Sequence, residues 1–326
     1  MTDTREKPAE NLPTISAAKL STKELGRISN LQVIVKEETP FLPKVAFTLI
    51  TLASLGGAIF TGFGFGLTAP ELGLRWFAIW TLALAGGFLI WRLCYLREVE
   101  AGLDAEAVGA LVSTALKRAD QVARIVGILV LVGAACTLFV SYFNFVPFIK
   151  YLVLASMIGL GALLIFGVSR RSIALPAAIL AGVLLVSWGI LDAGLDWNGA
   201  IRILHLTAFT LWLGGALWNI AVAMPSGRQH PDVTAVLAGA RQLDRFRWVV
   251  RFSLPTIIIT GLIMASVFTV LPMSWWLTFP GILIPLKVLT IVALVVVFIT
   301  CPLFRQCSPV QGVCNIEDLQ SPAKTA

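Results

Sequence analysis

The chain has 326 residues, of which 57% are hydrophobic and only 13% are charged, and its formal net charge is +7. In soluble domains about a quarter of all residues are charged, so a chain this apolar cannot cover a water-facing surface with polar groups. The composition therefore excludes a soluble globular protein and indicates an integral membrane protein.

The N-terminal segment, residues 1–44, differs from the rest of the chain because it is polar and contains Lys and Arg throughout. It lacks the apolar core of a signal peptide, so we expect a cytoplasmic tail. The five cysteines of the chain show no regular pairing, and no disulfide framework is predicted.

About eight apolar stretches follow, each near the 20 residues that a helix needs to cross the hydrocarbon layer. They must be helical, because lipid offers no partner for backbone polar groups. We group them into a first membrane half, 45–171, and a second, 172–303, followed by a cytoplasmic tail, 304–326. The predicted fold is an all-α polytopic membrane helix bundle. The expected spans are 45–67, 74–96, 125–147, 149–168, 172–191, 200–223, 249–271 and 281–303.

The positions of Lys and Arg predict the orientation, because cytoplasmic loops carry an excess of both. With the N-terminus inside, all but four of the 25 Lys and Arg residues fall on the cytoplasmic side, and the exceptions are Arg75, Lys150, Arg202 and Lys287. Both ends are therefore expected in the cytoplasm. The basic excess is an orientation signal that also suits contact with anionic membrane lipid, and nucleic-acid binding is not expected.

Two expected cytoplasmic loops, 97–124 and 224–248, are long and carry apolar residues at helical spacing beside basic ones. This pattern is typical of amphipathic helices. We expect both segments to lie along the membrane surface as interfacial helices.

A shift of 127 residues superposes like residues of the two membrane halves, which predicts a parallel repeat of four plus four helices. The mismatches are informative: Ala78 stands where the second half has His205, and Leu160 where it has Lys287. The matched pairs are Arg75 and Arg202, Leu84 and Leu211, Gly87 and Gly214, Trp91 and Trp218, Leu116 and Leu243, Arg118 and Arg245, and Arg124 and Arg251.

Ionisable residues within predicted membrane helices mark functional sites more often than not. His205 and Lys287 are expected at nearly the same depth below the outer face, and Asp192 and Arg202 lie close to that level. The alternative is that His205 and Lys287 only stabilise the bundle. Their shared depth, and their absence from the first half, favour a polar site that opens outward.

Further candidates extend this site. Trp212 and Asn219 share one helix face with His205, and Met264 and Met273 are soft donors near the outer end. Cys301, Cys307 and Cys314 follow the last helix as thiols that suit a soft metal, although ordinary reduced cysteines are the favoured interpretation there.

The stretch Arg202-Ile-Leu-His205, followed by Trp212-Leu-Gly214-Gly215, resembles the signature helix of the copper-resistance protein D (CopD) family. The resemblance covers about residues 200–300. It implies a multi-pass protein of the bacterial inner membrane that acts in copper uptake or tolerance with periplasmic copper-binding partners, with His205 as the metal ligand. Later matching motifs are Arg251-Phe-Ser253, Thr260-Gly261, Pro280-Gly281 and Leu286-Lys287.

Three functions stay open. The first is copper handling at His205, and the second is a structural or assembly subunit that docks other membrane proteins. The third is a haem-b-binding redox protein with His205 as axial ligand and Lys287 as second ligand or propionate partner. A membrane-bound, haem-binding type of protoporphyrinogen oxidase is similar in its helix histidine and later lysine. The sequence shows no triad, carboxylate pair or phosphate loop, so an enzyme is the less favoured class.

Overall fold

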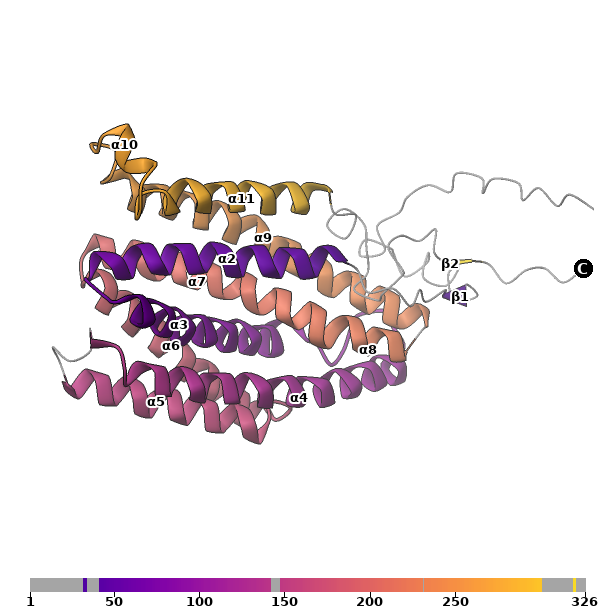
Figure 1. Ribbon diagram of the computed structural model, residues 1–326. Helices are drawn as coiled ribbons and strands as arrows, with labels where there is room; N and C mark the ends of the chain where they lie inside the picture. Colours follow the sequence, from indigo (N-terminus) through magenta and orange to yellow (C-terminus); the bar gives the residue numbers. More distant parts are fainter. Residues whose placement is uncertain (1–31, 34–40, 142–146, 231, 301–318, 321–326) are drawn as a thin grey trace, which may run out of the picture.

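Long helices run side by side along one axis in the computed structural model, which describes residues 32–33, 41–141, 147–230, 232–300 and 319–320 (Figure 1). Each is rich in apolar residues and closes its own backbone hydrogen bonds. The long helices are α2 (Phe41–Gly64), α3 (Ala69–Ile90), α4 (Ala105–Thr137), α5 (Pro147–Phe166), α6 (Arg171–Ala193), α7 (Trp197–Trp218), α9 (Val233–Ser266) and α11 (Leu283–Thr300).

Seven of these helices are long and apolar enough to cross a membrane. The eighth, α11, has 18 residues and therefore spans about 27 Å, close to the hydrocarbon thickness. The predicted all-α polytopic membrane bundle is confirmed, with one long helix for each expected span.

Short elements complete the described chain. The π-helical turns η2 (Trp91–Tyr95) and η4 (Asn219–Ala223) end α3 and α7, and α8 (Met224–Gln229) follows η4. Helix α10 (Met273–Trp276) lies between α9 and α11, at the end that we call the outer end because the α2–α3 and α6–α7 loops share it. Two-residue strands, β1 (Gln32–Val33) and β2 (Leu319–Gln320), pair antiparallel near the opposite, inner end.

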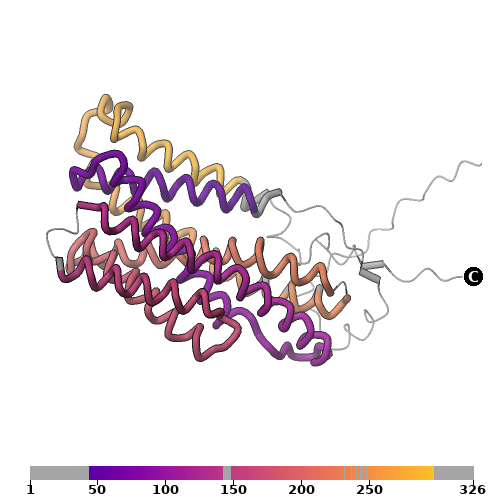
Figure 2. The backbone as a smooth tube through the Cα atoms, turned by 60° about the horizontal axis from the view of Figure 1, so that its bottom comes forward, coloured from indigo at the N-terminus to yellow at the C-terminus, as the bar shows by residue number. Residues whose placement is uncertain are grey.

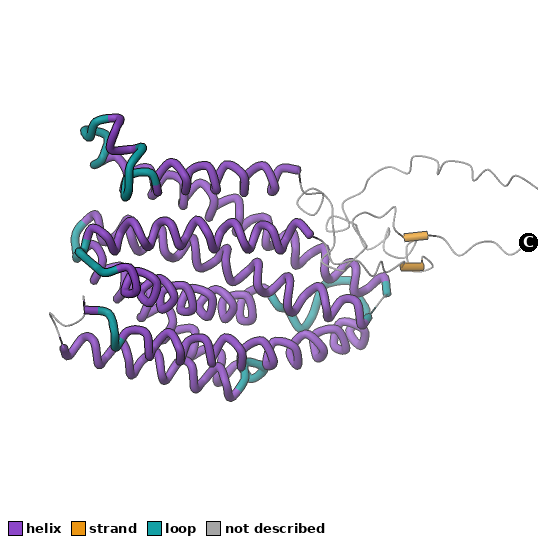
Figure 3. Tube along the Cα trace, viewed as in Figure 1, coloured by secondary structure: helices purple, strands orange, loops and turns teal. Residues whose placement is uncertain are grey.

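The prediction of two separate interfacial helices is wrong. Most of residues 97–124 and 224–248 belongs to α4 and α9, which continue without a break into the membrane (Figure 3). Asp104 and Asp232 cap these helices by accepting hydrogen bonds from Ala107 N and Ala235 N. The apolar stripes face protein instead of lipid, because the extensions of α4 and α9 pack against each other and against α8.

The order and packing of the helices follow the predicted repeat. Helices α2, α3, α4 and α5 correspond in order to α6, α7, α9 and α11, and a π-helical turn ends both α3 and α7. The last helix of each half packs against the first helix of the other: α5 contacts α6, and α11 contacts α2. The indigo and yellow tubes of α2 and α11 run together in Figure 2. The two halves thus interlock.

The centre of the bundle is the contact between α3 and α7, the matching second helices of the two halves. Gly87 and Gly214, which the 127-residue shift pairs, meet backbone to backbone, and a Cβ on either would collide with the other. The Trp91 indole reinforces this contact by donating to the carbonyl of Leu211 at 3.2 Å. Small residues are the usual means by which membrane helices approach this closely.

The halves differ in their last two helices. Helix α4 packs closely on α5 at Gly127 and Gly161, where a Cβ on Gly127 would lie 2.8 Å from the Gly161 carbonyl oxygen. In the second half the same shift places Leu254 and Val288 at these positions. Within the described residues, α9 and α11 make no comparable contact. The close glycine contact of the first half therefore has no counterpart in the described part of the second half.

Candidate functional site

His205 lies in the outer half of α7 and is buried against α9. Its Nδ1 lies 2.8 Å from Oγ1 of Thr260. The Thr260 hydroxyl also lies 2.5 Å from the carbonyl oxygen of Thr256, one turn earlier in α9. The ring is therefore held in one orientation by a hydroxyl that α9 itself positions.

A second contact completes the surroundings of the ring. The imidazole also makes a hydrogen bond with the backbone of Ile257, three residues before Thr260 in α9. A threonine hydroxyl has one proton, and the Thr260 hydroxyl donates to the backbone carbonyl of Thr256. In the tautomer with the proton on Nδ1, Oγ1 of Thr260 accepts from the ring and the lone pair lies on Nε2. Metal-binding histidines typically have one ring nitrogen fixed by a hydrogen bond and the other free to ligate, as this tautomer would provide.

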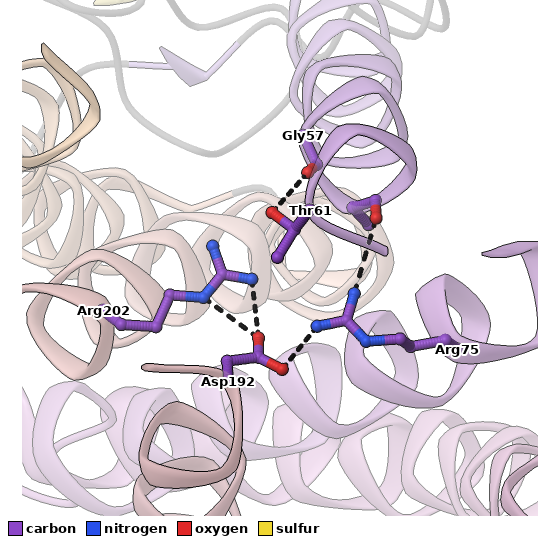
Figure 4. A network of polar contacts seen from close by, with 6 residues as sticks. Gly57, Thr61, Arg75, Asp192 and Arg202 are labelled. Atoms are coloured by element: carbon purple, nitrogen blue, oxygen red, sulfur yellow. Dashed lines mark hydrogen bonds and ion pairs between the residues drawn. The ribbon is translucent and has the colours of Figure 1, made fainter. Parts of the chain in front are cut away.

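A buried ion network lies beside this histidine at the outer end. Asp192, near the end of α6, accepts from Arg75 of α3 on one carboxylate oxygen at 2.5 Å. The other oxygen accepts from Nη2 and Nε of Arg202, in α7, at 2.8 and 3.1 Å. Figure 4 shows the two guanidinium groups approaching the carboxylate from different helices. The repeat-related arginines thus share one counter-ion.

Lys287 of α11 is the third cation at this level. Its ammonium group lies against the backbone of α2 at Gly57, where a Cβ would lie 2.7 Å from Nζ. Lys287 and Arg202 are the two cations that act electrostatically on His205. His205 and Lys287 are therefore close enough to interact electrostatically, and α2, α7, α9 and α11 all contribute residues to this region.

The first half of the molecule lacks this chemistry at the equivalent place. Ala78 corresponds to His205, and Gly133 corresponds to Thr260. These two small residues pack directly together, since a Cβ on Gly133 would lie 3.3 Å from Cα of Ala78. The second half has replaced a tight helix contact with a hydrogen-bonded imidazole.

The predicted sulfur donors differ in their positions. Met264 follows Thr260 by one helical turn on α9 and is half-buried, so it shares the face that carries the His205 contact. Met273 begins α10 and is 73% exposed. Cys301, Cys307 and Cys314 lie outside the described residues.

The other two candidates on α7 are buried but lie deeper. Trp212 is two turns below His205, and Asn219 lies in η4, about 21 Å below it along the helix. The Asn219 amide donates to the carbonyl of Gly215, while its own oxygen is buried without a partner in the described residues. Asn219 therefore belongs to the inner end of the bundle.

Sequence reasoning missed Gly57 and the role of Thr260 as a partner of His205. Thr260 lies 55 residues from His205, and only the packing of α7 on α9 brings them together. Gly57 carries no chemical signal, because its function is to leave space for Lys287. The repeat did indicate that Arg75 matters, because the 127-residue shift pairs Arg75 with Arg202.

No protein-family model, curated protein or solved structure matches the chain. The described residues contain no group of three or more His, Cys, Asp or Glu side chains that could hold a metal ion by themselves. The site therefore offers one buried imidazole, three cations and one carboxylate that is already paired.

Proposed function

We propose that the protein is a haem-b-binding membrane redox protein in which Nε2 of His205 is the axial ligand on the outer side of the membrane. The observation that carries this proposal is the 2.8 Å contact between His205 Nδ1 and Thr260 Oγ1, because in the Nδ1–H tautomer Nε2 is a buried, unprotonated donor. When bound, haem supplies one-electron chemistry, and the chain supplies the ligand and its orientation.

The donor set supports haem over a bare copper ion. Cu(I) is held mainly by thiolate, thioether and imidazole groups, and Met273 is exposed on α10, where it does not complete such a set. Three cations beside a single carboxylate also repel a free cation. Haem b is different because its two propionates are anionic, which suits the charge of Arg202 and Lys287.

The chain offers a matched test, because it has only two histidines. His230 lies at the inner end, where its Nε2 pairs with Thr114 Oγ1 at 2.8 Å. Protein purified in detergent from haem-replete cells is expected to show a Soret band that His205→Ala removes and His230→Ala keeps. A colourless wild-type preparation, or a Soret band unchanged in His205→Ala, would refute the proposal.

Copper handling is the second candidate, and the position of Met264 is the observation that favours it. Met264 lies one turn from Thr260 on α9, so His205 and Met264 are the pair that would hold Cu(I). In that case copper is expected in the purified protein and lost in both His205→Ala and Met264→Leu. A periplasmic copper-binding protein would then be the partner, and the bacterial inner membrane the location.

If the protein binds neither haem nor copper, it is a structural or assembly subunit of a membrane complex. His205→Ala and Lys287→Ala would then change only the stability of the protein or its association with other membrane subunits. Metal analysis and a visible spectrum of one preparation separate the three functions.

A further inference from the structure

The outer site has more positive than negative charge. Both oxygens of Asp192 are bound by Arg75 and Arg202, and Lys287 is close enough to Arg202 to interact with it electrostatically. Two further carboxylates at this end, Glu71 and Asp196, cap α3 and α7 instead. Buried charge of one sign is costly unless a counter-ion offsets it.

Two donors of this cluster are available. Arg202 uses Nε and Nη2 for Asp192, and its Nη1 has no partner among the described residues. Lys287 likewise makes no hydrogen bond or ion pair within the part of the chain that the structure describes. The side chain of Arg202 is 12% exposed, whereas Arg75 and Asp192 are 0% and 1% exposed. Arg202 is therefore the accessible end of the network.

The backbone of α2 is shaped to accommodate the lysine. Gly57 leaves space for Nζ, and Thr61, one turn along α2, satisfies its own hydroxyl by donating to the Gly57 carbonyl at 2.9 Å. Figure 4 shows the Thr61–Gly57 hydrogen bond on α2. Helices α7 and α11, which carry Arg202 and Lys287, both contact α2, and the two cations interact electrostatically.

The packing of the helices indicates how a ligand would arrive. Helices α9 and α11 are not closely packed, unlike α4 and α5, and His205 lies against α9 while Lys287 belongs to α11. A ligand that enters between these helices comes from the lipid and must itself be largely apolar. Its charged group would meet Lys287 and Arg202.

We infer that Arg202 Nη1 and Lys287 Nζ bind the carboxylate of an amphiphilic ligand that enters from the membrane between α9 and α11. Two sources share this chemistry: a haem propionate, in which case the inference rests on the proposed function, and a free long-chain carboxylate. A planar carboxylate matches one guanidinium nitrogen and one ammonium group by two charge-assisted hydrogen bonds.

The first arm of the test compares haem b with its dimethyl ester, in which both propionates are neutral. Each is titrated into the haem-free full-length protein, and the Soret band gives the two Kd values. The wild type is expected to bind haem b more tightly than the ester, and Lys287→Gln is expected to reduce this ratio about tenfold. Arg202→Gln should do the same. Lys150→Gln, which removes an exposed lysine at the same end, is the control and should leave the ratio unchanged.

The second arm uses no haem. Decanoate and decanol are compared by the shift of the thermal unfolding midpoint that each causes in the haem-free protein, since a ligand of the folded state raises it. If decanoate raises the midpoint more than decanol does, and Lys287→Gln abolishes this difference, the carboxylate site is supported even when no Soret band forms. In that case the proposed haem function is refuted and the carboxylate site stands. If neither arm separates the carboxylate from its neutral analogue, the inference is overturned. Lys287→Gln keeps the Arg75–Asp192–Arg202 network, so loss of folding does not obscure the result.

Discussion

Single hydrogen bonds decide the chemistry of the outer site. Thr260 carries no charge, yet its hydroxyl holds the imidazole of His205 in one orientation. Asp192 is likewise no ligand, but it is the one carboxylate that both repeat-related arginines share. Neighbours without a ligand role thus hold the imidazole and the two arginines in place.

Thr260→Val keeps the shape of the side chain and removes the acceptor for His205 Nδ1. The buried imidazole then lacks a partner, so we expect the free energy of unfolding to fall by about 1–3 kcal/mol and haem affinity to fall with it. Thermal unfolding and haem titration measure the two effects. Thr256→Val is the control, because Thr256 takes part through its backbone carbonyl, which the change leaves in place. Equal behaviour of the two variants would argue against the assigned role of Thr260.

Asp192→Asn leaves two arginines without a counter-ion, and Arg75 is fully buried. Removing one partner of a buried ion pair costs about 3–5 kcal/mol, so a large drop in the unfolding midpoint is expected in detergent. Asp196→Asn is the matched control at the same end, because Asp196 is exposed and only caps α7. Its effect should be about 1 kcal/mol or less. A smaller loss for Asp192→Asn than for Asp196→Asn would contradict a structural role of the network.

At the level of helices, the two halves use the same elements with different contacts. Glycine permits the close approach of α3 to α7 and of α4 to α5, whereas α9 and α11 have larger residues at the corresponding positions. The polar site lies where the glycine contact is missing. The two halves therefore differ both in helix packing and in chemistry.

Gly214→Ala tests the central contact. The new Cβ would collide with the backbone of Gly87, so α3 and α7 must separate, at a cost of about 1–3 kcal/mol or more. Gly182→Ala is the control, because Gly182 lies within α6 with open space around it and alanine is the better helix former. Thermal unfolding in detergent should show a lower midpoint for Gly214→Ala and an unchanged or higher one for Gly182→Ala. The reverse order would refute the assigned contact.

Over the whole molecule, the sequence predicts the architecture better than the site. Apolar stretches of membrane length locate every long helix, and the 127-residue shift anticipates that Arg75 and Arg202 occupy matching positions. The sequence predicts the inner extensions of α4 and α9 at the membrane surface, which is wrong, because an apolar stripe does not reveal whether protein or lipid covers it. The Thr260 and Gly57 contacts depend on how helices cross, which no local pattern encodes.

The orientation can be tested with two exposed loop residues. Val99 lies in the loop before α4 at the inner end, and Leu195 lies in the α6–α7 loop at the outer end. In a cysteine-free background, a membrane-impermeant maleimide should label Leu195→Cys in intact cells, because the distribution of Lys and Arg places this end outside. Val99→Cys should react only after the cells are permeabilised. The opposite pattern would invert the topology.

The pairing of α2 with α11 has a consequence for biogenesis. Helix α2 can pack against α3 and α7 early, but its partner α11 is synthesised much later, and these two helices carry Gly57 and Lys287. A nascent chain that stops before α11 retains His205 and Thr260 but has no ammonium group to place on α2. The complete cluster therefore forms only at the end of synthesis, so truncated chains in the membrane cannot assemble it.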